Sequence, residues 1–190
     1  MARVPDVSTA LKPTRGRGTM SPSARSRLWA LLLFAPPAQG DDLPEYRLKA
    51  AFVYNFIVYT EWPVEKNATL NVCILGTDPF GPEIDGLQGK VVAGRNIAVQ
   101  RKAAGEPFSN CQVVFIPASA MQNLPRLLEG LRGQPVLTVA DTPGAMRQGV
   151  ALNMAVSQGK VTFEANLQAA RSAGLTLSSK LLRLATEVRQ

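Results

Sequence analysis

Histidine is absent from this 190-residue chain, and cysteine occurs only twice. Imidazole is the commonest general base in enzymes and the commonest metal ligand, so the most frequent designs of hydrolase and metal site are missing. Two cysteines alone are too few for a usual structural zinc site. The expectation is a protein that is not an enzyme and that has no cofactor and no metal.

The glycine-rich and nucleophile motifs are missing as well. The chain has no G-x-G-x-x-G, no G-x-x-x-x-G-K-[ST] and no G-x-S-x-G. Most of its carboxylates, such as Asp78 and Asp85, have spacings that suit solvated turns. Asp141 is the exception, because it follows an apolar strand and ligands of open α/β sheets bind at the carboxyl ends of strands.

The first 40 residues have the layout of a secretory signal. Basic residues precede the short apolar run Leu28–Ala35, and Ala38-Gln39-Gly40 resembles a small-residue cleavage site. Cleavage is predicted after Gly40, and Met20 is an equally suitable start. A basic tail with a chance apolar patch is the alternative. The signal predicts export to the periplasm.

The positive charge of the chain is concentrated in this first segment. Residues 1–40 carry six basic residues and one acidic residue, whereas residues 41–190 carry 15 and 13. Phosphate binding needs clustered cations on the folded domain, so no nucleic-acid partner is expected. Residues 41–190 have a suitable length for a single domain.

Cys73 and Cys111 are the only cysteines, and both follow the predicted signal. An isolated pair in an exported protein predicts one disulfide, with two unlinked buried thiols as the alternative.

Residues 46–63 contain a strongly apolar helix. From Ala50 to Tyr59 the only strongly polar residue is Asn55, and Glu61-Trp62-Pro63 ends the helix. The segment is too short to span a bilayer. It has more apolar circumference than one core face needs, so the second face is expected to contact either a further layer of the domain or a partner.

The remaining sequence predicts an α/β fold with a mostly parallel sheet and helices on both faces. Apolar strands are expected at Thr69–Leu75, Cys111–Ile116 and Pro135–Ala140, with a half-buried edge strand at Arg95–Arg101 and a helix at Ala120–Leu131. Right-handed crossovers would place the strands of Cys73 and Cys111 side by side.

The end of the chain predicts a hairpin and two helices. Val150–Val156 and Lys160–Glu164 flank the three-residue connection Ser157-Gln158-Gly159. A helix over Asn166–Ala173 is expected to stop at Gly174. A final helix, capped by Ser178 or Ser179, would gather one apolar face, which consists of Leu181, Leu184, Ala185 and Val188.

Two stretches together resemble the YfiR-like family of periplasmic regulators. The first is Tyr46-Arg47-Leu48-Lys49-Ala50-Ala51-Phe52-Val53-Tyr54-Asn55-Phe56 with Glu61-Trp62-Pro63. The second comprises Phe163-Glu164-Ala165-Asn166, Ala169-Ala170, Ala173-Gly174-Leu175 and Ser178-Ser179-Lys180-Leu181-Leu182-Arg183-Leu184-Ala185. The similarity extends from about residue 45 to residue 186.

The resemblance implies a non-enzymatic regulator that binds and represses the periplasmic sensing domain of an inner-membrane diguanylate cyclase. It also implies lower cyclic di-GMP, less biofilm, a homodimer, and sequestration by an OmpA-like outer-membrane lipoprotein. Cys73 and Cys111 match the family's core disulfide by placement, while a second pair found in some members is missing here. The alternative function is a periplasmic small-molecule-binding component of a sensor or transport system.

Two sets of residues follow as candidates. Tyr59, Glu61 and Trp62 are candidates for partner binding, because interfaces favour Tyr and Trp anchors. Four polar residues of the motifs are candidates for a structural role; for Glu164, Asn166 and Lys180 this role is to cap helix ends or pair with one another, and the alternative is that they line a partner surface. These four are Asn55, Glu164, Asn166 and Lys180.

Overall fold

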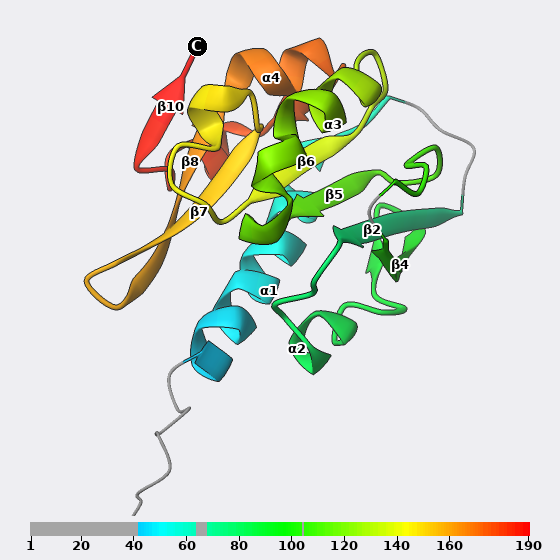
Figure 1. Cartoon of the computed structure of the whole chain (residues 1–190), viewed down its shortest axis with the longest axis horizontal. Helices are drawn as coiled ribbons and strands as arrows, with labels where there is room; N and C mark the ends of the chain where they lie inside the picture. The colour runs from blue at the N-terminus through cyan, green and yellow to red at the C-terminus, as the bar shows by residue number, and fades with distance from the viewer. Residues whose placement is uncertain (1–41, 64–67, 104) are drawn as a thin grey trace, which may run out of the picture. The chain divides into compact units, whose positions relative to one another are not determined.

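A mixed sheet of eight strands lies at the centre of the described structure (Figure 1). The computed structural model describes residues 42–63, 68–103 and 105–190, with side chains from residue 45 onward. All of these residues belong to one compact unit, Ala38–Gln190. The predicted cleavage site and both possible starts of the chain lie outside the described residues.

The strands of this sheet are ordered β10-β8-β7-β6-β5-β2-β4-β3. Their bounds are β2 (Thr69–Leu75), β3 (Val91–Val92), β4 (Arg95–Lys102), β5 (Val113–Ile116), β6 (Leu137–Ala140), β7 (Leu152–Ser157), β8 (Lys160–Asn166) and β10 (Glu187–Arg189). The five neighbouring strands β4, β2, β5, β6 and β7 run parallel to one another. At one edge β3 pairs antiparallel with β4, and at the other β8 pairs antiparallel with β7, while β10 is parallel to β8. The predicted mostly parallel sheet is confirmed, and so is the adjacency of β2 and β5.

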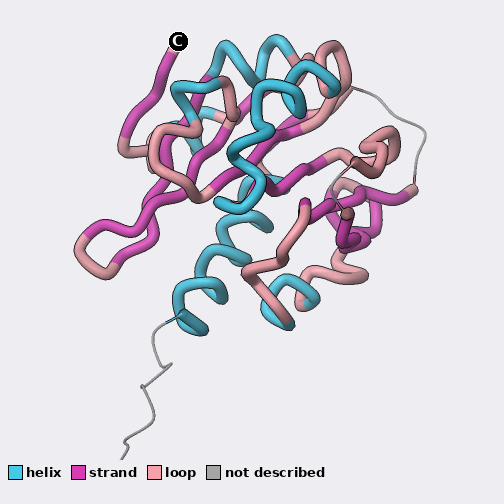
Figure 2. The backbone as a smooth tube through the Cα atoms, in the orientation of Figure 1, coloured by secondary structure: helices cyan, strands magenta, loops and turns pink. Residues whose placement is uncertain are grey.

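Helices cover both faces of the sheet (Figure 2). They are α1 (Asp42–Val58), α2 (Pro82–Asp85), η1 (Ala118–Asn123), α3 (Leu124–Gly130), η2 (Met146–Gln148), α4 (Leu167–Ser172) and α5 (Ser179–Leu182), of which η1 and η2 are 3₁₀ helices. The predicted helix at Ala120–Leu131 is therefore a 3₁₀ segment followed by α3.

The two faces bury separate apolar clusters because side chains alternate along each strand. Val72 and Ile74 of β2 join α1 and α2 in the larger cluster, whereas Cys73 and Leu75 join α3 in the smaller one. Leu167 of α4 and Leu181 of α5 add to the larger cluster. Strands that are buried on both faces explain the apolar runs from which they were predicted.

The closing hairpin has a shorter connection than the three residues predicted. Ser157 pairs with Lys160, which leaves Gln158 and Gly159 as a two-residue loop. Both loop residues have positive φ, 51° and 72°. This is the backbone of a primed turn, whose twist matches that of the flanking strands.

The predicted final helix exists as α5, but its predicted extent is wrong. Ser178 caps a helix that ends at Leu182, and Leu184 lies 70 % exposed. Residues 187–189 form β10, in which Val188 is paired with Ala165 at the edge of the sheet. The predicted apolar face therefore does not exist, because the backbone after Leu184 pairs with β8.

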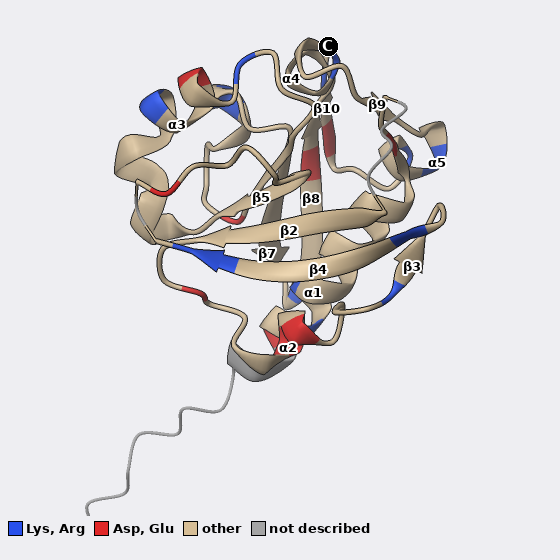
Figure 3. Cartoon of the chain, turned by 90° about the vertical axis from the view of Figure 1, so that its right-hand side faces the viewer, with Lys and Arg blue, Asp and Glu red and all other residues tan. Residues whose placement is uncertain are grey.

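The predicted edge strand β4 is the last long strand but not the outermost one, because β3 adds two residues beyond it. Basic residues occupy both ends of β4, and acidic residues lie in α2 (Figure 3). Arg101 donates to Asp78 and Asp85, and Lys102 lies 3.6 Å from Glu106. Arg101 and Lys102 are therefore neutralised locally.

Among the described residues, no helix is both long enough and apolar enough to cross a membrane.

Candidate functional site

Helix α1 exposes an apolar strip to solvent. Its other side is fully buried through Val53, Phe56 and Ile57. The strip comprises Leu48, Ala51, Asn55 and Val58, which follow one another at steps of three or four residues and are all exposed. Leu48 is 50 % and Val58 is 40 % exposed. We call these four residues the α1 strip; exposed apolar side chains on one face of a helix can form an interaction site.

Half-buried aromatic side chains flank the α1 strip. Phe52 packs edge-on against Phe163 of β8 with ring centroids 5.9 Å apart. Tyr54 lies under the ammonium of Lys90, whose Nζ is 4.7 Å from the ring centroid. Both rings pack against the larger apolar cluster on one side and reach the surface on the other, so they offer apolar area beside the strip.

The end of α1 is joined to the end of the chain. Thr60–Glu61 forms β1, which pairs antiparallel with β9 (Thr176–Leu177). Ser178 donates its backbone N–H to the carbonyl of Tyr59 at 3.0 Å, and the Thr60 hydroxyl donates to the carbonyl of Phe56 at 2.6 Å. The two motifs that carry the family resemblance therefore meet in one small ladder.

The three predicted partner-binding residues lie at this ladder with different exposure. Glu61 is exposed, whereas Tyr59 and Trp62 are half-buried against the larger apolar cluster. The indole N–H of Trp62 is shielded from solvent and has no hydrogen-bond partner among the described residues. Tyr59 and Trp62 therefore support the core as well as reach the surface, and their role in partner binding stays a prediction.

The four polar motif residues do not form one group. Asn55 is exposed in the α1 strip, and Lys180 is exposed on α5 without an ion pair to another described residue. Glu164 accepts from the amide of Asn153 at 3.2 Å. The buried Asn166 caps α4, because its Oδ1 accepts from Ala169 N at 3.0 Å while its Nδ2 donates to the carbonyl of Met146 at 3.1 Å.

A buried ion pair fixes the start of α1 to the carboxyl edge of the sheet. Asp141 directly follows β6, and its Oδ2 lies 2.8 Å from Lys49 Nζ, with both side chains only 5 % exposed. Glu45 also pairs with Lys49. The Tyr46 hydroxyl donates to the same oxygen of Asp141 at 3.1 Å. The carboxylate of Asp141 at this strand end is thus bound by side chains of α1 and has a structural role.

Lys49 is the important residue that the sequence interpretation missed. The one available signal was a lysine immediately before the apolar run that starts at Ala50. The burial of Lys49 by itself lowers the pKa of its ammonium, but hydrogen bonds to Asp141 and Glu45 outweigh the burial, and the pKa lies above the ordinary 10.5. Burial and the nearby charge of Asp141 raise the pKa of Tyr46 from 10.0 to about 12.

These shifts predict a loss of stability at alkaline pH. Both pKa values are higher in the folded state, so between pH 10 and about 12 the folded chain holds more protons and the free energy of unfolding falls as pH rises. Tyr46→Phe removes the phenolic part of this dependence and should flatten the slope. Urea unfolding at several pH values from 9 to 11.5 measures the free energy of unfolding of both proteins. If this free energy falls equally steeply with pH in the wild type and in Tyr46→Phe, the assignment to Tyr46 is wrong.

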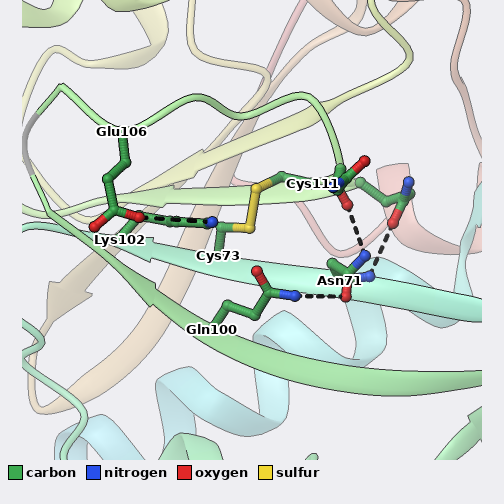
Figure 4. The surroundings of a disulfide bond; sticks show 8 residues. Asn71, Cys73, Gln100, Lys102, Glu106 and Cys111 are labelled. Atoms are coloured by element: carbon green, nitrogen blue, oxygen red, sulfur yellow. Dashed lines mark hydrogen bonds and ion pairs between the residues drawn. A yellow bond between two sulfur atoms is a disulfide. The ribbon is translucent and has the colours of Figure 1, made fainter.

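Disulfide geometry is also set by the sheet. Cys73 of β2 and Cys111, which precedes β5, are joined with their Cα atoms 5.9 Å apart (Figure 4). The disulfide therefore has the predicted pairing. Among the described residues, no group of three or more Cys, Asp or Glu side chains could hold a metal ion.

Comparison with known proteins identifies a family and a similar solved structure. A family model described as YfiR/HmsC-like matches residues 46–186. A crystal structure of a conserved domain protein from Vibrio cholerae O1 biovar eltor str. N16961 matches with a TM-score of 0.49 and 9 % sequence identity. That match covers 76 % of this chain and 60 % of the Vibrio chain, so this chain spans less than two thirds of the length of that structure.

Proposed function

The chain belongs to the YfiR/HmsC-like family, and on this premise we propose that it binds and represses the periplasmic sensing domain of an inner-membrane diguanylate cyclase. Proteins of this family are periplasmic regulators that are not enzymes. Repression would lower cyclic di-GMP and biofilm formation. The absence of histidine fits a protein that acts by occupying a partner rather than by chemistry.

The α1 strip is the observation that carries this proposal. Leu48 and Val58 lie ten residues apart on one side of a rigid helix, with only the Asn55 amide between them as a strongly polar group. A helix that presents apolar side chains at such steps is a common recognition element for a groove on another protein. Glu61, exposed just beyond the strip, adds a charged rim.

The same surface can serve the other proposed partners. A homodimer would pair two α1 strips across a twofold axis, because such an interface uses the same patch on both subunits. An OmpA-like lipoprotein that sequesters the repressor would compete for the strip and release the cyclase. We propose that these three interactions are mutually exclusive at the strip.

Charge placed in the strip is expected to abolish repression. Leu48→Glu and Val58→Glu each put a carboxylate into the contact and should weaken binding to the cyclase domain at least about tenfold, or about 1.4 kcal/mol. Purified domains titrated by calorimetry measure the affinity. In cells, periplasmic expression of the wild-type domain in a deletion strain should lower cyclic di-GMP, and the variants should not.

Matched controls carry the same substitution at exposed positions elsewhere. Val91 is 62 % exposed on β3 and Leu184 is 70 % exposed after α5. Val91→Glu and Leu184→Glu should bind and repress like the wild type. Tyr59→Ala and Trp62→Ala are also expected to weaken binding about tenfold, but their half-buried rings make a melting curve necessary. Equal repression by strip variants and controls would refute the proposed surface.

A further inference from the structure

A recess of about 510 Å³ lies on the face of the sheet opposite α1. Its lining comes from the carboxyl end of β2, from the segment between β4 and β5, and from η1 and α3. It is lined by Leu75, Thr77, Phe108, Ser119, Arg126 and Leu127, among others. The volume falls in the range of small-molecule sites.

The topology of the sheet places this recess where ligands bind in open parallel sheets. From β2 the chain passes through α2 to β4 on one side, then returns across β2 to β5 and continues to β6 on the other side. Right-handed connections in opposite directions lie on opposite faces, so a crevice opens at the carboxyl ends of β2 and β5. Leu75 ends β2, and Ser119 follows the end of β5 by three residues.

The walls of the recess are apolar and fixed. Leu75 and Leu127 are 6 % and 9 % exposed, and the half-buried Phe108 packs against the same cluster. Cys111 donates its N–H to the carbonyl of Phe108 at 2.9 Å, and the disulfide joins Cys111 to β2. The wall that carries Phe108 is thereby held in place, so a ligand would meet a preformed surface.

Glycine keeps the strand end open. Gly76 has a φ of 68°, which L side chains rarely adopt, and an added Cβ there would lie 3.9 Å from the Ser119 hydroxyl. The left-handed turn directs the chain away from β2 at the recess, and no side chain enters the space from this position.

One cation at the rim is not neutralised within the described chain. Lys102 and Glu106 lie beside the disulfide and pair with each other (Figure 4). The carboxylate of Glu106, which lines the recess, is therefore paired with Lys102. Arg126 is exposed on α3, lines the recess, and forms no ion pair with another described residue. Apolar walls with a guanidinium at the mouth suit a ligand that has an apolar body and one anionic end.

We propose that this recess binds a small amphiphilic carboxylate, with its apolar tail against Leu75, Phe108 and Leu127 and its carboxylate on Arg126. The site lies on the sheet face opposite α1 and is independent of the proposed repressor surface. Its occupancy would make the protein a receptor for such acids.

Octanoate and its neutral analogue octanamide test the site on the purified full domain by titration calorimetry. The wild type should bind octanoate saturably at one site and more tightly than octanamide. Arg126→Ala should weaken octanoate at least about tenfold and leave octanamide nearly unchanged. Ser119→Trp, which fills the recess from its exposed rim, should abolish binding of both.

Two controls locate the binding. Arg132→Ala removes an exposed arginine that follows α3 and lies outside this recess, and Leu48→Glu changes the α1 strip; both should bind octanoate like the wild type. Absence of saturable octanoate binding would overturn the proposal. So would unchanged binding in Ser119→Trp, or a loss in Leu48→Glu, which would place the acid on the α1 strip instead. None of these results depends on whether the protein represses a cyclase.

Discussion

Replacing Lys49 by Met is expected to lower the free energy of unfolding by about 3–5 kcal/mol, because it leaves the buried Asp141 carboxylate without its cation. Both side chains are only 5 % exposed and their charged atoms are 2.8 Å apart. Met fills nearly the same volume, so the loss reports the charge rather than a cavity. Urea unfolding measures it as a lower midpoint at unchanged slope.

The same helix provides a matched control for this experiment. Arg47 also pairs with an acid, Glu83, at 3.1 Å, but its side chain is 76 % exposed. Arg47→Met should therefore cost less than about 1 kcal/mol. The double variant Lys49→Met/Asp141→Leu removes both charges and should recover much of the loss. Equal effects of Lys49→Met and Arg47→Met would show that the pair at Asp141 is not buried in solution.

Removal of the disulfide is expected to have the second largest effect. Cys73 and Cys111 are separated by 38 residues in sequence, and closing a loop of this length restricts the unfolded chain. The chain-entropy treatment gives a stabilisation of about 4 kcal/mol as an upper value, and about 2–4 kcal/mol is typical. The variant Cys73→Ala/Cys111→Ala is preferred to serines, because both positions are buried and a hydroxyl would add its own cost.

Reduction provides the internal comparison. Dithiothreitol should lower the melting temperature of the wild type toward that of the double-alanine variant, and it should not change the variant. Thiol titration of the unreduced, denatured protein should find no free cysteine among the two in the sequence. Two reactive thiols, or a wild type whose stability is indifferent to reductant, would contradict a stabilising cross-link.

The sheet could be predicted from sequence because its strands are marked by local patterns. Thr69–Leu75 was predicted with the bounds that β2 has, since its apolar run ends at Gly76. The position of β5 beside β2 followed from the handedness of crossovers, which needs no side-chain detail. Capping is a local interaction, so the sequence could suggest Asn166 as a cap and narrow the other cap to Ser178 or Ser179; the structure shows Asn166 and Ser178 as the caps.

The errors concern pairings between distant residues. The spacing of Leu181, Leu184 and Val188 suits a helix, but Thr186 donates its N–H to the carbonyl of Phe163 and the chain joins the sheet edge. Lys49 was missed because its only local signal is its position just before the apolar run, and many solvated lysines share such a position. Its partner Asp141 is 92 residues away in sequence.

The position of α1 has a kinetic consequence. This helix comes first in the described chain, yet its packing partners include Phe163 of β8, and the ladder at its end needs Thr176–Leu177. Contacts between such distant segments slow folding, because the loop between them must close before the contacts form. Until β8 and β9 have been synthesised, α1 can pack only against nearer segments such as α2, and its remaining contacts cannot form. A chain emerging from the ribosome is therefore expected to complete its fold only when nearly its whole length is available.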